Sequence, residues 1–145
     1  MIKHIWFDFS DTLASISYFS YCLTDPNIPK VLEDLGKIIP ISLFSNIDVK
    51  RILPDLNINP EWFTHILSAN QVGAPKPALD GFNKIIELSG VPREEIIYIG
   101  DHLEKDIIPA KTVGIKAGTV FEKVPEADYC FEDFKDILEF IKKNK

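Results

Sequence analysis

Short apolar runs alternate along the chain with segments of helical periodicity, and this alternation limits the possible folds more than any other feature. The first run, residues 2–9, is almost continuously apolar, as expected of a strand buried on both faces of a sheet. Further runs of this kind are 38–44, 63–67, 96–99, 115–121 and a short one at 127–131. Strand–helix alternation at this spacing predicts a parallel sheet with helices on both faces, a three-layer α/β domain.

The segments with helical periodicity lie between these runs. Residues 78–88 place apolar side chains at spacings of three and four, which is typical of a helix with one buried face. The other helical patterns are at 29–37, 47–56, 104–113 and 132–142. Pro54 and Pro109 fall inside two of them, and a proline interrupts a helix because it lacks an N–H group. Residues 14–28, rich in Ser, Tyr and Phe, follow neither pattern, and we expect an irregular segment there.

The size and charge of the chain bound its class. Its 145 residues are the size of one domain, residues 1–145. Lys and Arg number 16 and Asp and Glu 22, so the net charge is −6, which disfavours nucleic acid as a partner. No apolar stretch approaches the roughly 18 residues that a membrane span needs, and the N-terminus lacks the pattern of a signal peptide. We therefore expect no membrane association.

The cysteines indicate the compartment. Cys22 and Cys130 are the only two, they are far apart in the sequence, and they form no CxxC pair. This usage predicts neither a disulfide framework nor a zinc site. We expect two buried or half-buried thiols in a reducing compartment, and hence a cytoplasmic protein.

Polar residues follow the predicted strands at the point where each strand ends. They are Asp8 and Ser10, then Ser45 and Asn46, then Lys76, and finally Asp101 and Asp106. In an open α/β sheet, ligands bind beyond the carboxyl ends of the strands. We therefore expect these side chains to form one site.

The residue types in this set suit phosphate chemistry with a metal ion. Asp8 and Asp101 offer hard oxygen donors for Mg²⁺, and carboxylates so close together repel one another without a cation. Ser45 and Asn46 offer hydrogen-bond donors to phosphoryl oxygens, and Lys76 offers a positive charge. A carboxylate beside a metal can act as a nucleophile and form an aspartyl phosphate.

Taken in order, these segments resemble the four motifs of the haloacid dehalogenase-like (HAD) hydrolase superfamily. The segments are FDFSDTL at 7–13, LFSN at 43–46, KP at 76–77 and IYIGDHLEKD at 97–106. The corresponding family patterns are F-D-x-D-[GD]-T-L, hydrophobic residues before S/T-N, K-P, and G-D-x(4)-D. Each motif alone is a weak signal, but four in order at strand ends across nearly the whole chain are a strong one. The resemblance implies a Rossmann-like domain with the first strand near the centre and the strand order 5-4-1-2-3.

The resemblance also implies a role for each matching position. Asp8 is expected to be the nucleophile and a Mg²⁺ ligand, and Ser10 to bind the metal through its backbone carbonyl. Ser45 and Asn46 are expected to bind the phosphoryl group of the substrate, with Lys76 neutralising its charge. Two further acids complete the set, Asp101 as the second metal carboxylate and Asp106 as an outer ligand or one bound through water.

One departure from the family pattern bears on activity. The residue two places after the nucleophile is the general acid and base in the family's phosphatases, and here it is Ser10. A general acid typically contributes about 10²–10⁴ in rate. Asp11 follows at a position from which we expect its carboxyl group to point the wrong way to replace the missing acid. Metal binding should survive, because position 10 contributes a backbone oxygen.

Three interpretations follow from this departure. The first is a Mg²⁺-dependent phosphatase that is slow or restricted to good leaving groups. The second is a catalytically impaired phosphate-binding or regulatory protein of the same fold. The third is a 2-haloacid dehalogenase, which Asp101 and Asp106 disfavour because the metal-free dehalogenases need no such pair. We expect the first.

The spacing of the motifs leaves no room for a sizeable cap domain. Only a short stretch separates residue 13 from the second strand, and the 29 residues between 46 and 76 have room for one helix and one strand. A site without a cap is open to a phosphorylated small molecule or macromolecule. We therefore expect a homo-oligomer or a large substrate to cover it, with residues 14–28 as a possible flap or rudimentary cap.

Overall fold

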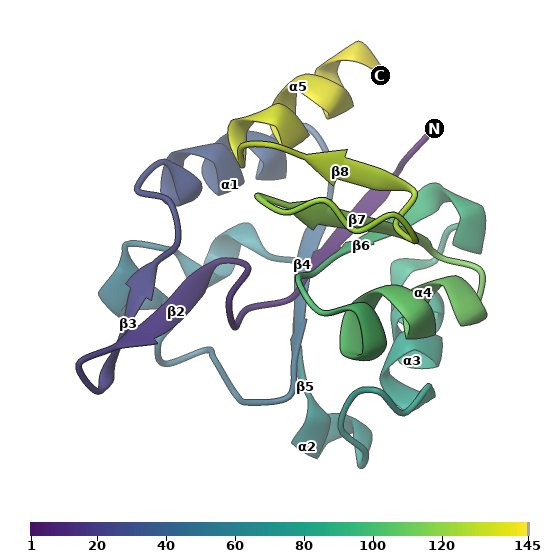
Figure 1. The fold of residues 1–145 in the computed structure, drawn as a ribbon, viewed down its shortest axis with the longest axis horizontal. Coiled ribbons are helices and arrows are strands. Elements are labelled where there is room, and N and C mark those ends of the chain that lie inside the picture. Colours follow the sequence, from purple (N-terminus) through teal and green to yellow (C-terminus); the bar gives the residue numbers. More distant parts are fainter. Residues whose placement is uncertain (145) are drawn as a thin grey trace.

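The computed structural model describes residues 1–144 and has a six-stranded parallel sheet at its centre (Figure 1). The strands lie in the order β5-β4-β1-β6-β7-β8. Their bounds are β1 (His4–Phe7), β4 (Ile41–Ser45), β5 (His65–Ser68), β6 (Ile96–Ile99), β7 (Lys116–Val120) and β8 (Tyr129–Phe131). The predicted fold class is confirmed, and so is the predicted order of the five main runs, with the short sixth strand added at the edge beside β7.

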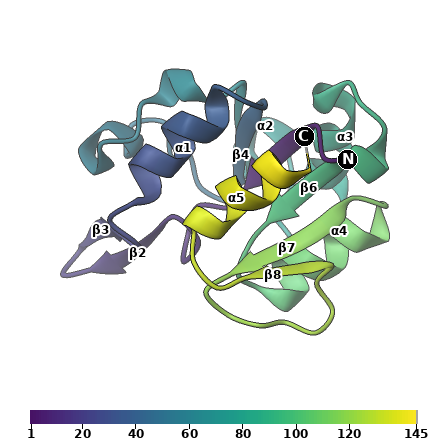
Figure 2. The same ribbon diagram turned by 90° about the horizontal axis from the view of Figure 1, so that it is seen from above.

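Helices cover both faces of the sheet, as the alternation predicts (Figures 1 and 2). The helices are α1 (Ile28–Gly36), α2 (Ala69–Val72), α3 (Asp80–Ser89), α4 (Ile108–Thr112) and α5 (Lys135–Lys143). Short 3-10 turns are η1 (Leu53–Leu56), η2 (Pro60–Trp62) and η3 (Arg93–Glu95), and η4 (Leu103–Ile107) is a π-helical turn. Within residues 1–144, no helix combines the length and apolar character that a membrane crossing requires.

The central strand β1 divides its side chains between two apolar clusters. Ile5 and Phe7 belong to the cluster under α1 and α5, whereas Trp6 belongs to the cluster under α3 and α4. All three are fully buried. A strand buried on both faces must be apolar at successive positions, which explains the continuous run in the sequence. The first polar residue after β1 is therefore held at the carboxyl edge of the sheet by two layers of packing.

The helix predicted over residues 47–56 does not form. The chain makes bends and turns there, and its only regular element is the 3-10 turn η1. Pro54 cannot donate a helical hydrogen bond, and Asn57 takes a left-handed φ of 60° that ends the turn. Upstream, the Asp48 carboxylate accepts a hydrogen bond from the backbone N–H of Lys50, which favours a turn over a helix.

The segment 14–28, expected to be irregular, contains an antiparallel hairpin of β2 (Ala14–Ser17) and β3 (Ser20–Leu23). The hairpin projects from the body of the protein (Figure 1). Its two turn residues, Tyr18 and Phe19, both have positive φ, at 49° and 65°. Such turns favour Asn-Gly, so a turn made of two aromatic residues does not carry the sequence signal from which a hairpin is predicted. Both aromatic side chains are fully exposed.

Two smaller expectations need adjustment. The helix predicted over 104–113 is divided between η4 and α4, and Pro109 lies in the first turn of α4, where its missing N–H costs nothing. The prediction of two buried or half-buried thiols is wrong. Cys22 and Cys130 are both exposed, because each lies on an edge strand whose outward face meets solvent.

A histidine is buried beside the sheet at the start of β1. His4 is only 3% exposed, its Nε2 lies 2.8 Å from Ser42 Oγ, and its ring stacks on Trp6 and His65. Burial lowers the pKa of His4 from 6.5 to about 4, with a further contribution from His65. The native state therefore resists protonating this ring, while the unfolded chain accepts a proton near pH 6.5.

This difference makes stability depend on pH. We expect the free energy of unfolding to fall as pH drops from 6.5 towards 4, by on the order of 2 kcal/mol for this group, because only the unfolded state binds the proton in that window. Urea unfolding of wild type and His4→Gln across that range checks this. The variant should lose markedly less stability on acidification, and equal losses in the two proteins would contradict the assignment to His4.

Candidate active site

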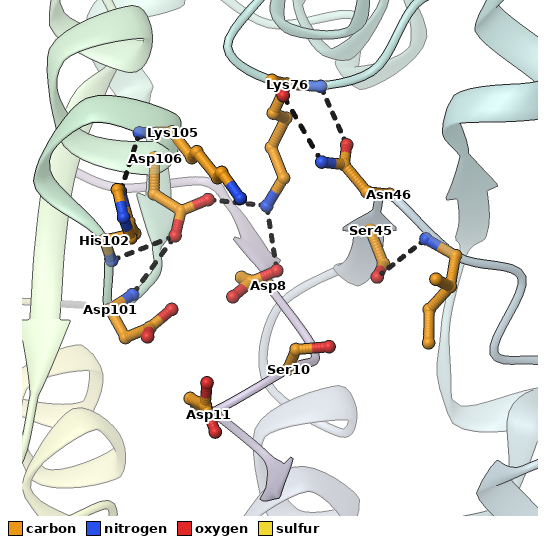
Figure 3. Close-up of a pocket in the computed structure, with 11 residues that line it drawn as sticks. Asp8, Ser10, Asp11, Ser45, Asn46, Lys76, Asp101, His102, Lys105 and Asp106 are labelled. Carbon is orange, nitrogen blue, oxygen red and sulfur yellow. Dashed lines mark hydrogen bonds and ion pairs between the residues drawn. The ribbon is translucent and has the colours of Figure 1, made fainter. Parts of the chain in front are cut away.

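Three carboxyl groups meet at the carboxyl ends of β1 and β6 (Figure 3). Asp8 directly follows β1, and Asp101 lies just beyond β6, which pairs with β1 so that Phe7 is opposite Ile99. Asp106 comes back to the same place from η4. One carboxylate oxygen from each of the three acids lies within 4.8 Å of the others. The structure thus brings together the acids that the sequence predicted as one group.

Lys76 enters this acidic cluster from the loop between α2 and α3. Its Nζ donates to Asp8 Oδ1 at 2.8 Å and to Asp106 Oδ1 at 2.5 Å. The lysine and Asp8 are each 5% exposed, and Asp106 is 1% exposed. A buried ammonium held between two carboxylates is strongly positioned, because loss of either partner leaves an uncompensated charge.

Two further residues hold Lys76 in place. The Tyr98 hydroxyl accepts from Lys76 Nζ at 2.9 Å and donates to the carbonyl oxygen of Phe44 at 2.8 Å. Asn46 binds the lysine backbone, accepting from its N–H at 2.7 Å and donating to its carbonyl at 3.3 Å. Both ends of the Asn46 amide are therefore hydrogen-bonded to the backbone of Lys76, so Asn46 positions Lys76. Phosphate binding by Asn46 stays a prediction.

Ser45 and Ser10 complete the polar wall of the site. Ser45 ends β4, is almost fully buried, and its Oγ accepts from the backbone N–H of Ile47 at 3.3 Å. Both serines line a cavity of about 170 Å³ together with the acids and Lys76. The seven residues predicted from the sequence are therefore neighbours in space.

Asp11 lies at the edge of the same cavity, and one oxygen of its carboxylate is engaged with Ser15. That its carboxyl group is turned the wrong way to replace the missing acid stays a prediction. Its backbone is left-handed, with φ of 62°, and its N–H donates to the carbonyl of Ala14 at 2.8 Å. The Asp11 carboxylate accepts a hydrogen bond from Ser15 Oγ at 2.8 Å, and the residue is exposed. Figure 3 shows it at the edge of the cavity, beyond Ser10.

The loop after β6 is shaped around the Asp106 carboxylate. Asp106 Oδ2 accepts from the backbone N–H groups of Asp101 and His102 at 3.3 and 3.1 Å. A Cβ on Gly100 would lie 2.6 Å from Asp106, so only glycine fits there. His102 Nδ1 accepts from the backbone N–H of Lys105 at 3.2 Å, so this histidine helps to shape the loop.

The charges in the site do not balance. Burial raises the pKa of Asp8 to about 8, against the opposing effect of Lys76, and Asp106 raises it further. Burial also raises the pKa of Asp101. Burial acts to lower the pKa of Lys76, but Asp8 and Asp106 outweigh it and raise that pKa. Three acids against one cation leave excess negative charge, which a divalent cation would compensate.

Tyr98 and Thr12 are functional candidates that the analysis of the sequence did not single out. Thr12 is fully buried, and its hydroxyl donates to Asp8 Oδ2 at 3.3 Å. Tyr98 is also fully buried, in an otherwise aliphatic strand. That composition is the signal that could have found it, because a buried tyrosine hydroxyl needs a hydrogen-bond partner.

Removing the Tyr98 hydroxyl should weaken the whole arrangement. We expect Tyr98→Phe to lose about 1–2 kcal/mol of unfolding free energy, because Lys76 and the Phe44 carbonyl each lose a buried partner. Urea denaturation measures this. Tyr18→Phe is the matched control, since its side chain is 96% exposed and should change stability by less than about 0.5 kcal/mol. Equal effects of the two substitutions would contradict the positioning part assigned to Tyr98.

Known sequences place this site in context. Residues 24–120 match the sequence model of a family described as haloacid dehalogenase-like hydrolase. The chain is also 28% identical over 97 residues to a glyceraldehyde 3-phosphate phosphatase of Methanocaldococcus jannaschii. The matched region covers 62% of this chain and 42% of that protein. The chain spans less than half the length of the curated relatives it matches.

Solved structures share the fold. An HAD phosphatase from Thermococcus onnurineus has a TM-score of 0.79 and 17% identity, covering 97% of this chain and 98% of that one. A 2-haloacid dehalogenase from Pseudomonas syringae has a TM-score of 0.80 and 16% identity, covering 100% of both chains. These likenesses show a Rossmann-like fold of the same extent, without a cap domain among the described residues.

Proposed function

Because the chain belongs to the haloacid dehalogenase-like hydrolase family, we propose that it is a Mg²⁺-dependent phosphatase that works through an aspartyl phosphate on Asp8. The observation that carries the proposal is the buried Lys76 ammonium, 2.8 Å from Asp8 Oδ1 at the carboxyl edge of the sheet. A fixed cation there orients the attacking oxygen and offers positive charge to an incoming phosphoryl group. The phosphatase activity in the name of the archaeal relative supports the same class of reaction.

The residues around Asp8 divide the work. In our proposal Asp8 attacks phosphorus through a carboxylate oxygen, and the carboxylate is oriented by Lys76 at Oδ1 and by Thr12 at Oδ2. Ser45 donates its hydroxyl to a phosphoryl oxygen, and Lys76 compensates the charge of the group being transferred. Asn46 and Tyr98 hold Lys76 in a position from which it can contact both Asp8 and the phosphoryl group. The cavity is large enough for one phosphoryl group, and the rest of the substrate would extend into the open mouth.

The acids fit a Mg²⁺ ion. Asp8 and Asp101 would hold it directly with the backbone carbonyl of Ser10, and Asp106 would act through water. The fit rests on the close approach of three carboxylate oxygens and on the excess negative charge of a buried site. When bound, Mg²⁺ supplies positive charge for the phosphoryl oxygens.

The rival function is a phosphate-binding or regulatory protein whose chemistry is impaired at Ser10. Both functions use the same metal and phosphate ligands, so binding alone does not separate them. Turnover does, because only the phosphatase needs Asp8 as a nucleophile. A 2-haloacid dehalogenase is the weaker alternative, since the site keeps the Asp101 and Asp106 pair.

Hydrolysis of an aryl phosphate with Mg²⁺ tests the proposed function. An aryl leaving group needs little protonation, so the assay examines the nucleophile separately from the missing acid. We expect wild-type turnover that Asp8→Asn lowers by about 10³-fold or more. The matched control is Asp55→Asn, an exposed acid outside the site that should leave the rate unchanged. Absence of turnover in wild type, together with binding of inorganic phosphate in calorimetry, would favour the rival function.

We further propose that a homo-oligomer covers the open site. The hairpin exposes Ile16, Tyr18 and Phe19, and fully exposed aromatic side chains in a left-handed turn are costly unless they make contacts. Light scattering at micromolar concentration should report more than one copy, and Tyr18→Ser with Phe19→Ser should lower the mass. A wild-type monomer would count against this proposal without affecting the proposed chemistry.

A further inference from the structure

Phosphoryl transfer through Asp8 makes two different demands on proton transfer. In the first step the leaving group departs with an electron pair, and an alkoxide needs a proton whereas a carboxylate does not. In the second step water attacks phosphorus and must give up a proton to a base. The inference below rests on the proposed function and concerns which of these steps the side chains of the site can assist.

Ser10 and Asp11, two and three places after the nucleophile, are not placed to assist either step. Ser10 presents a hydroxyl that is half-buried and has no base beside it among the side-chain contacts of residues 1–144. Asp11 has a carboxylate, but Ser15 Oγ holds it at 2.8 Å and the left-handed backbone is tied to Ala14. The hydrogen bond and the backbone together hold Asp11 at the edge of the cavity, with Oδ1 bound by the hairpin residue Ser15.

The other polar side chains of the cavity are engaged elsewhere. Asp106 accepts from Lys76 and from two backbone N–H groups, so its oxygens already have donors. His102 uses Nδ1 to accept from the backbone N–H of Lys105, which leaves its proton on Nε2 and no nitrogen free to accept another. Lys105 is exposed, and its ammonium group offers hydrogen-bond donors only. Asp101 belongs to the acidic group that faces the metal position.

From this arrangement we infer that the protein acts as a phosphoryl acceptor, charged by acyl phosphates and discharged slowly. In the charging step an Asp8 carboxylate oxygen bonds to phosphorus while the bond from phosphorus to the acyl oxygen breaks. The electron pair leaves with the carboxylate, which needs no proton. In the discharging step water bonds to phosphorus and the electron pair of the broken bond returns to Asp8. The water proton passes to solvent, because no side chain among those described above is positioned to receive it.

This arrangement determines which phosphate esters and anhydrides react with Asp8 and how long the aspartyl phosphate lasts. Acyl phosphates charge Asp8, whereas alkyl phosphates do so poorly because their alkoxide lacks a general acid. Hydrolysis of the aspartyl phosphate is slower by about 10²–10⁴ than with a carboxylate at position 10, the usual contribution of a general base. The phosphorylated form therefore accumulates, and another protein could bind it or accept its phosphoryl group.

Intact-mass measurement after treatment with acetyl phosphate and Mg²⁺ tests the inference. We expect wild type to gain the mass of one phosphoryl group and to release one equivalent of acetate in a burst before slow turnover. Asp8→Asn should gain nothing. Ser10→Asp should lose the adduct about 10²-fold faster or more, whereas Asn83→Asp, which adds a carboxylate at an exposed position of α3, should behave like wild type.

The possible failures are distinguishable. Burst-free turnover of acetyl phosphate that disappears in Asp8→Asn, without an adduct, overturns this inference and leaves the proposed function intact. An adduct that accumulates only in Asp11→Asn assigns the base to Asp11 and also overturns it. If wild type and Ser10→Asp show neither adduct nor turnover, the proposed function fails as well. The burst in wild type decides the matter even where Ser10→Asp does not fold.

Discussion

The ammonium of Lys76, buried between the carboxylates of Asp8 and Asp106, is the interaction on which the site depends. Without it both carboxylates would lose a cationic partner at a depth where an isolated carboxylate is costly. The lysine joins three parts of the chain that are far apart in the sequence, since Asp8 follows β1 and Asp106 lies in η4. Fixing this cation therefore fixes the relative positions of the strand ends that hold the nucleophile and the remaining acids.

The rest of the fold serves to hold that lysine and its partners still. The sheet places β1 between β4 and β6, so side chains beyond their carboxyl ends converge without any further device. Tyr98 then connects the lysine to the carbonyl of Phe44 at the end of β4. Gly100 leaves room for the Asp106 carboxylate to pack against the loop after β6. The result is a rigid polar cluster whose excess negative charge suits a divalent cation.

The parts that sequence patterns predicted are those with simple physical causes. Continuous apolar runs fix the buried strands, and polar residues at their ends fall at the binding edge, so Asp8, Ser45 and Asp101 could be grouped in advance. Lys76 follows α2 in the structure, and its lysine–proline motif was the signal that joined it to the group. The patterns failed where a local contact decides the outcome. Nothing in the sequence of the hairpin indicates a turn, because Tyr18 and Phe19 take the conformation that glycine and asparagine usually fill. Likewise, the apolar spacing of 47–56 indicates a helix, but Pro54 and the turn at Asp48 prevent it.

The central claim is that Asp8, and not another acid of the cluster, receives the phosphoryl group. Borohydride reduces an aspartyl phosphate to a stable alcohol, so reduction of the phosphorylated protein followed by peptide mass mapping locates the acceptor directly. The account predicts reduction at Asp8 alone, dependent on the phosphoryl donor and on Mg²⁺. Reduction at Asp11, Asp101 or Asp106 with Asp8 unmodified would contradict the arrangement described for this site.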